Sequence, residues 1–185
     1  MSDGITFHDY PPEPVTIAYL LEQHGWASLN VRVGGSEVEI GSFGYCTDAL
    51  GDLVRAAVAI ATGAMTAQVI FDGEPTLWGI VIQDGWQSTL RPQAFRFSVR
   101  SRSRDDGTSP SQVSSWSDVV AEGYITADAF AMAVSEAAHL VLTQHGEEGY
   151  LARWDMHPFL ARALVALDAA LAAPPQSSIG SPLSA

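Results

Sequence analysis

The sequence predicts an α+β domain in which an antiparallel β-sheet of about six or seven strands carries three α-helices on one face. Short segments with alternating apolar and polar residues are joined by hairpin-type turns, and three longer segments carry apolar residues at helical spacing. The 185 residues, of which 47% are apolar and 16% charged, suffice to bury one substantial core. A single globular domain is therefore expected.

We expect that domain to span residues 15–173. Residues 1–14 contain Pro11, Pro12 and Pro14 and should form an extended lead-in, because proline cannot continue a helix. Residues 103–118 are rich in Ser, Asp and Gly, which predicts a mobile loop, and residues 174–185 predict a disordered tail.

The strands are expected in two groups separated by a helix. The first group is a strand near residues 15–22 and a hairpin, 29–33 with 38–40, that turns at Gly34-Gly35-Ser36, where glycine accepts a positive φ. The second group comprises strands near residues 67–71, 77–82, 94–102 and 119–125.

Three helices follow from apolar residues at i, i+3, i+4 and i+7 spacing. The first starts near residue 47 and ends before Gly63; the second is capped by Thr126, is apolar almost all round and ends before Gly146; the third follows Pro158. The inward faces are predicted to be formed by Leu50, Leu53, Val54, Ala57, Val58 and Ala61; by Phe130, Val134, Ala137 and Val141; and by Leu160, Leu164, Leu167 and Leu171.

The charge balance limits the kinds of partner. The formal net charge is −12, and all nine cations are arginine. This balance repels nucleic-acid phosphates and anionic lipids but attracts a basic protein, so we expect no nucleic-acid or membrane partner. The lone Cys46, expected as a small buried apolar group, and the absence of a signal-peptide pattern favour a cytoplasmic location.

Five arginines within residues 91–104 give this stretch a charge of +5. In the strand predicted there, Arg96, Arg100 and Arg102 share the face opposite the core. The three guanidinium groups could bind a phosphate or an acidic segment of a partner. Alternatively, they pair with carboxylates such as Glu37 and Glu39 across strands, and this interpretation is favoured.

Asp48 and Asp52 are four residues apart at the start of the first predicted helix, and so lie on one face. Two such carboxylates could bind a metal ion or divide general acid and base roles. Carboxylates in a first helical turn also complement the helix dipole, which is the favoured interpretation.

His145, Glu148, Asp155 and His157 form the second candidate site, as metal ligands or as an acid/base pair. Their spacing matches no metal-ligand signature, so no metal ion or cofactor is expected. The favoured interpretation is a solvated turn that contains Glu147 and Glu148 and that Arg153 and Trp154 dock onto the core. The two glutamates are also candidate binding residues. His139, within the second helix, is expected to be a hydrogen-bonded packing residue.

Four segments together resemble an uncharacterised family of small bacterial proteins. They are residues 45–53 (YCTDALGDL), 71–75 (FDGEP) and 145–150 (HGEEGY), and Trp154 with residues 157–159 (HPF). The resemblance extends from about residue 25 to residue 171 and implies a single α+β unit. It adds no catalytic residues.

Three functional hypotheses remain at this stage. The first is a non-enzymatic, cytoplasmic binding protein, of the immunity or regulatory type, that presents an acidic surface to a basic partner. The second is a small metal-dependent hydrolase that uses Asp48 and Asp52, or the segment from His145 to His157. The third is a subunit of a homo-oligomer, which would expose a large apolar face as a monomer.

Overall fold

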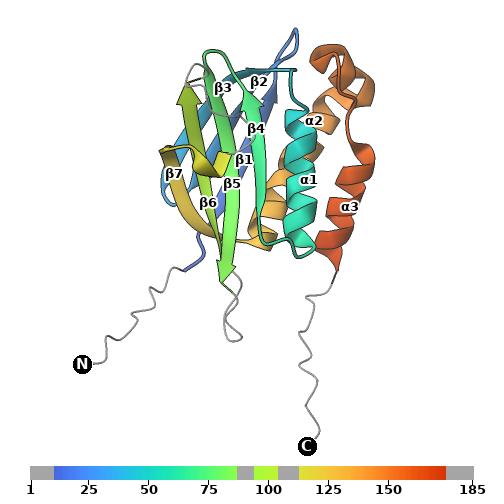
Figure 1. Ribbon diagram of the computed structural model, residues 1–185. Coiled ribbons are helices and arrows are strands. Elements are labelled where there is room, and N and C mark those ends of the chain that lie inside the picture. The colour runs from blue at the N-terminus through green and yellow to red at the C-terminus, as the bar shows by residue number, and fades with distance from the viewer. Residues whose placement is uncertain (1–10, 87–93, 104–112, 174–185) are drawn as a thin grey trace, which may run out of the picture.

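The computed structural model describes residues 11–86, 94–103 and 113–173, which form two antiparallel sheets and three helices (Figure 1). The first sheet has the order β1-β2-β3, with β1 (Val15–Leu21), β2 (Trp26–Val33) and β3 (Ser36–Gly44). The second has the order β4-β5-β6-β7, with β4 (Ala67–Asp72), β5 (Thr76–Trp86), β6 (Ala94–Ser103) and β7 (Asp118–Thr126). The helices are α1 (Ala49–Ala61), α2 (Ala127–Trp154) and α3 (Ala161–Ala172).

The α+β class and the antiparallel strands are confirmed, and the strands form two sheets where the sequence pattern suggested one. The chain leaves the first sheet at the end of β3, forms α1 and enters the second sheet at β4. Between the two sheets only an isolated bridge, Phe43 with Gly73, is formed among the described residues. Alternation along a strand shows which residues face the core, but it does not show which sheet the strand joins.

The main core lies between the inner faces of the two sheets and the helices. The strands alternate as predicted, and their buried side chains merge with those of α1 and α2 into one cluster. The sheets approach closely where the Gly34–Gly35 turn meets β7. A Cβ atom added at Gly123 would lie 2.7 Å from Val33 Cγ2, so this contact requires a glycine.

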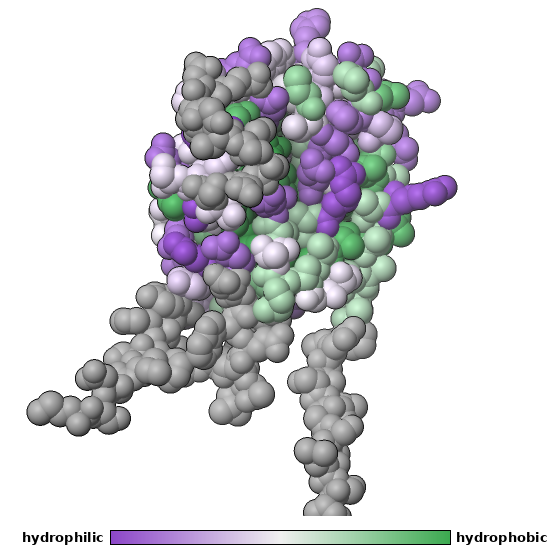
Figure 2. Space-filling model, viewed as in Figure 1, coloured by the Kyte–Doolittle hydropathy of each residue, from purple (hydrophilic) through white to green (hydrophobic). Residues whose placement is uncertain are grey.

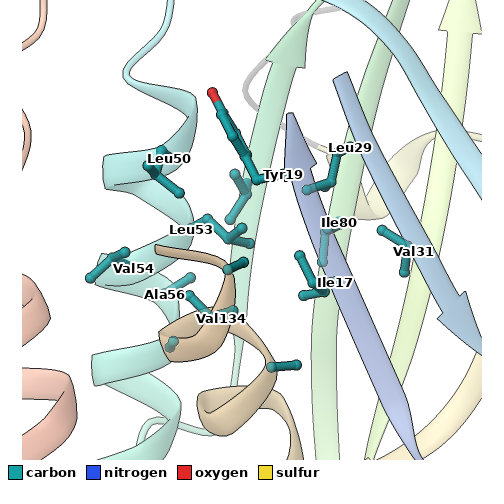
Figure 3. Close-up of a cluster of buried hydrophobic side chains, with 14 of the residues drawn as sticks. Ile17, Tyr19, Leu29, Val31, Leu50, Leu53, Val54, Ala56, Ile80 and Val134 are labelled. Carbon is teal, nitrogen blue, oxygen red and sulfur yellow. The ribbon is translucent and has the colours of Figure 1, made fainter. Parts of the chain in front are cut away.

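The helices lie together beside the sheets, but they cover different elements (Figure 1). α1 packs against β4, α2 packs against β1, and α3 packs against α1 and α2. Figure 3 shows Leu50 and Leu53 of α1 directed toward Tyr19 and Ile17 of β1. The predicted inner faces of α1 and α3 are confirmed by the burial of Leu50, Leu53 and Leu164, among others.

α2 differs from its prediction in two ways. It is not buried all round, because Met132 and Leu140 are about half exposed. Gly146 does not end the helix but breaks it: its φ of 65° and ψ of 174° are not helical, and a second helical segment, residues 147–154, follows at once. No helix within the described ranges is long and apolar enough to cross a membrane.

A second, smaller apolar cluster covers the outer face of the second sheet. It contains Leu77 and Val81 of β5 together with Val113, the first residue of the short 3₁₀ turn Val113–Ser115, and Trp116, the residue after that turn. The segment expected to be a mobile loop, residues 103–118, therefore includes a part that packs on the sheet, while residues 104–112 lie outside the described residues. Gly79 provides the space for Val113 in this contact.

We predict that Gly79→Ala destabilises the protein by about 1–3 kcal/mol, because the added Cβ would overlap the side chain of Val113. Gly41→Ala, in β3, is the matched control, since a Cβ there meets nothing within 4 Å. Urea denaturation of both variants measures the difference. Val113→Ala should restore part of the loss in the Gly79→Ala background, and an equal effect of the two glycine variants would contradict the assigned packing.

Candidate functional site

The three predicted binding arginines lie on the outer face of β6, and two of them are buried. Arg100 donates hydrogen bonds to Ser98 Oγ (3.2 Å) and to the backbone carbonyls of Ser114 (3.1 Å) and Trp116 (2.7 Å). The guanidinium carbon of Arg102 lies 5.0 Å from the centre of the Trp116 ring, a cation–π distance. Arg100 and Arg102 therefore hold the segment around Trp116 on the sheet.

The favoured interpretation, pairing within the protein, holds for Arg96, but with a different partner. Arg96 forms its ion pair with Glu122 of β7, the strand beside β6. Glu37, the partner expected from the sequence, pairs instead with Arg32 at 2.7 Å. Hydrogen bonds from Arg32 and Asn30 lower the pKa of Glu37. Glu37 lies on β3, in the other sheet, which explains why the expected pairing fails.

Asp48 and Asp52 share one counterion at the start of α1. Arg55 Nη2 lies 2.8 Å from Asp48 Oδ2 and 2.5 Å from Asp52 Oδ1. Asp48 occupies the N-cap position, but its side chain makes no capping hydrogen bond. Because one guanidinium group engages both carboxylates, the pair is held as an ion-paired cluster with Arg55, a partner that the sequence analysis did not name.

A buried polar centre lies next to this cluster. Among the described residues, four buried side-chain atoms have no hydrogen-bond partner in this region: Tyr19 Oη, Thr47 Oγ1, Asp48 Oδ1 and Trp154 Nε1. The Trp154 ring lies 6.5 Å from the Tyr19 ring and 6.4 Å from the Tyr150 ring. In Figure 3 the Tyr19 hydroxyl points toward the end of α1 that carries Leu50. Buried polar atoms of this kind are usually satisfied by ordered water.

The residues of the second candidate site do not gather around a metal position. His145, Glu148, Asp155 and His157 all belong to the described residues, and no group of three or more His, Cys, Asp or Glu there could hold a metal ion. His157 Nε2 lies 3.1 Å from the backbone carbonyl oxygen of Tyr45. Burial and the nearby Arg153 lower the pKa of His145. The hydrolase hypothesis therefore has no metal centre in this part of the chain.

Glu147, Glu148 and Asp155 instead form an exposed acidic face with Leu151 at one end of the molecule. Glu147, Glu148 and Leu151 are exposed on the second segment of α2, and Asp155, the residue that caps its C-terminus, is exposed as well, whereas Tyr150 and Trp154 of the same segment are buried.

Three connections meet at this end: β1–β2, β3–α1 and α2–α3 (Figure 1). The backbone N–H of Gly25 donates to the carbonyl of Arg153 at 2.7 Å, which joins the first connection to the third. Trp26, Tyr45 and Met156 are exposed here, as is Cys46, which was expected to be buried. We call the exposed residues Trp26, Tyr45, Glu147, Glu148, Leu151, Asp155 and Met156 the tip.

Figure 2 shows hydrophilic and hydrophobic residues interspersed at the end where the tip lies. Trp26 and Tyr45, unlike the glutamates, were not predicted from the sequence pattern. Each of these aromatic residues directly follows a glycine: Trp26 follows Gly25 and opens β2, and Tyr45 follows Gly44, the last residue of β3.

Ser135, His139 and Asp168 contain the residue types of a catalytic triad but not its arrangement. Asp168 lies in the middle: its carboxylate accepts from Ser135 Oγ at 2.8 Å and lies 2.9 Å from His139 Nε2. In a hydrolytic triad the histidine must bind the serine hydroxyl. The group joins α2 to α3, and His139, with 50% of its side chain exposed, is a surface residue rather than the expected packing residue.

No family model and no curated protein matches the chain, which is consistent with its resemblance to an uncharacterised family. One solved structure, titled "CdiA-CT/CdiI toxin and immunity complex from Enterobacter cloacae", is similar over 67% of this chain and 99% of that chain. The TM-score is 0.43 and the sequence identity 5%.

We predict that Arg100→Met destabilises the protein by about 2–4 kcal/mol, because the buried carbonyl of Trp116 and the partly buried carbonyl of Ser114 lose their charged donor. Arg32→Met is the matched control: it removes an exposed ion pair and should have a much smaller effect. Urea denaturation provides the comparison. Similar losses in the two variants would contradict the structural role of Arg100.

We predict that stability falls above about pH 10, the ordinary pKa of tyrosine, and that Tyr150→Phe makes this fall shallower. Burial, reinforced by the Asp48 carboxylate, raises the pKa of Tyr150, and burial with Tyr150 and Asp48 raises that of Tyr19. These hydroxyls then ionise in the unfolded chain before they do so in the folded protein, so unfolding releases protons at alkaline pH.

Urea denaturation between about pH 9 and pH 11 measures the slope of this fall. The slope is the readout rather than the stability at neutral pH, because the variant also changes packing. A wild-type slope in both Tyr150→Phe and Tyr19→Phe would contradict the prediction.

Proposed function

We propose that this protein is a non-enzymatic binding module, of the immunity or regulatory type, that holds a basic protein partner through its acidic surface. The observation that carries the proposal is the unequal use of the two kinds of charge. Five of the nine arginines are ion-paired or buried within the fold: Arg32, Arg55, Arg96, Arg100 and Arg102.

Many carboxylates, in contrast, face solvent. Among the described residues, seven exposed carboxylates have no ion pair: Glu39, Asp118, Asp128, Glu136, Glu147, Glu148 and Asp155. With a net charge of −12, their field extends beyond the protein surface and attracts a cationic partner. Complementary charge of this kind raises association rates and disfavours unsuitable partners.

The geometry gives the hydrolase hypothesis no comparable support. Asp48 and Asp52 are tied to Arg55, and Ser135 and His139 contact Asp168 rather than each other. A nucleophile and its base must lie within hydrogen-bonding reach, and none of the candidates predicted from the sequence meets this condition in the described structure.

We also propose a cytoplasmic location, for which the single Cys46 is the supporting feature.

We predict that the immobilised protein captures a basic partner from a lysate at about 0.05 M salt and releases it at about 0.5 M, because salt shortens the range of charge attraction. Mass spectrometry identifies the captured protein. Calorimetry with the purified partner then tests for saturable binding at a fixed ratio, which separates a specific complex from general adsorption.

Two outcomes would contradict the proposal. One is a partner of acidic or neutral charge, and the other is an affinity that does not change with salt. Light scattering of the protein alone also tests the homo-oligomer hypothesis, which requires a mass above that of one 19.7 kDa chain.

A further inference from the structure

We propose that the tip is the docking surface for the basic partner and that it takes a segment containing arginine or lysine side chains. This inference rests on the proposed function and adds the place of contact and the kind of side chain bound. It is carried by the combination, at one end of the molecule, of exposed aromatic rings with carboxylates that have no ion pair among the described residues.

The carboxylates lie on and next to a short helical segment that the core holds in place. Glu147 and Glu148 are exposed at its start and Asp155 is exposed at its C-cap, and the segment is anchored by Tyr150 (1% exposed) and Trp154 (0%). Residues 147–155 carry three acids and one base, Arg153, which leaves a charge of −2. Arg153 is partly buried, so the exposed face is acidic.

The aromatic rings are also supported from below. A Cβ atom at Gly25, which has a φ of 74°, would overlap the ring of Tyr45, so this ring lies directly on the glycine backbone. The ring of Trp26 lies 3.8 Å from the position that a Cβ would take at Gly44. Trp26 and Tyr45 are nevertheless 37% and 38% exposed. Rings held in this way lose little conformational entropy when a partner binds.

The chemistry of the surface selects the occupant. Arginine and lysine place an aliphatic stem on apolar side chains and a charged group on an aromatic face or a carboxylate, and the tip offers all three. Leu151 and Met156 supply the apolar contacts. A second copy of this chain is a poorer occupant, because two surfaces with the same acidic helix face repel each other.

Other acidic positions lack this combination. Glu37 on β3 already has Arg32 as its partner, and Glu122 on β7 has Arg96. Glu136 is exposed and has no ion pair among the described residues, but it lies on the first segment of α2, before the break at Gly146. Its two neighbours in the chain, Ser135 and Ala137, are both buried. Glu136 therefore serves as a matched control for the tip glutamates.

The test uses NMR titration of the full-length, ¹⁵N-labelled protein with a synthetic peptide of about twelve residues that contains arginine and leucine. We expect shift changes concentrated at the Trp26 indole and in residues 25–26, 45–46 and 147–157. Glu147→Gln/Glu148→Gln and Trp26→Ala should each weaken the affinity by about fivefold or more. Glu136→Gln removes one charge on the same helix and should change it by less than about twofold.

The same variants are then used in the salt-dependent capture of the basic partner. Loss of capture by the tip variants, with capture retained by Glu136→Gln, supports the docking surface. Shift changes spread evenly over all carboxylates, or capture unaffected by Trp26→Ala and Glu147→Gln/Glu148→Gln, would overturn it while leaving the proposed function intact. If the wild-type protein captures no basic partner at all, the proposed function itself fails.

Discussion

The burial of Trp154 is the packing interaction on which the rest of the structure depends. Its ring contacts Tyr19 of β1, Phe43 of β3 and Tyr150 of its own helix, and Phe43 in turn contacts Phe71 of β4. This chain of rings connects the two sheets to the end of α2, and Phe43 also forms the isolated bridge to Gly73. Aromatic contacts of this size contribute large apolar areas and fix relative orientation. The tip is built directly above this cluster, so the position of its exposed residues is set by the core beneath them.

The fold also separates its charges. Arg100 and Arg102 hold the segment around Trp116 on the sheet, and Arg55 binds the carboxylates at the start of α1. Glu147 and Glu148 of α2 form no ion pair among the described residues. A surplus of exposed like charge lowers the stability of the compact state through self-repulsion. In this protein several arginines are bound within the fold, so the surface that remains is acidic and attracts a cationic partner over a long range. The tip adds the apolar and aromatic groups that a close interface requires.

The sequence predicted elements well where local periodicity determines them. The Gly34–Gly35 hairpin, the burial of Leu50 and Leu53, and the Thr126 cap, whose hydroxyl accepts from the Ala129 N–H, all follow from spacing and residue type. The sequence did not predict which segment covers a given face of a sheet. Alternation correctly placed Arg100 opposite the core, but nothing local indicates that residues 113–116 fold back over it. For the same reason the division into two sheets, the exposure of His139 and the partner of Glu37 could not be derived from the pattern.

Gly146 shows how one residue affects both the core and the surface. The helix was expected to end before this glycine, and the straight helix does end there. The next eight residues are helical again, because Tyr150 and Trp154, four residues apart, can bury one side of a new segment. The change of direction carries that side into the aromatic cluster and turns the side with Glu147, Glu148 and Leu151 to solvent. In an uninterrupted helix Tyr150, which follows Val141 by nine residues, would lie about 180° away from it, on the side opposite the buried Val134 and Val141. The break therefore lets the second segment bury Tyr150 and Trp154 independently of the core face of the first segment, while Glu147 and Glu148 stay exposed.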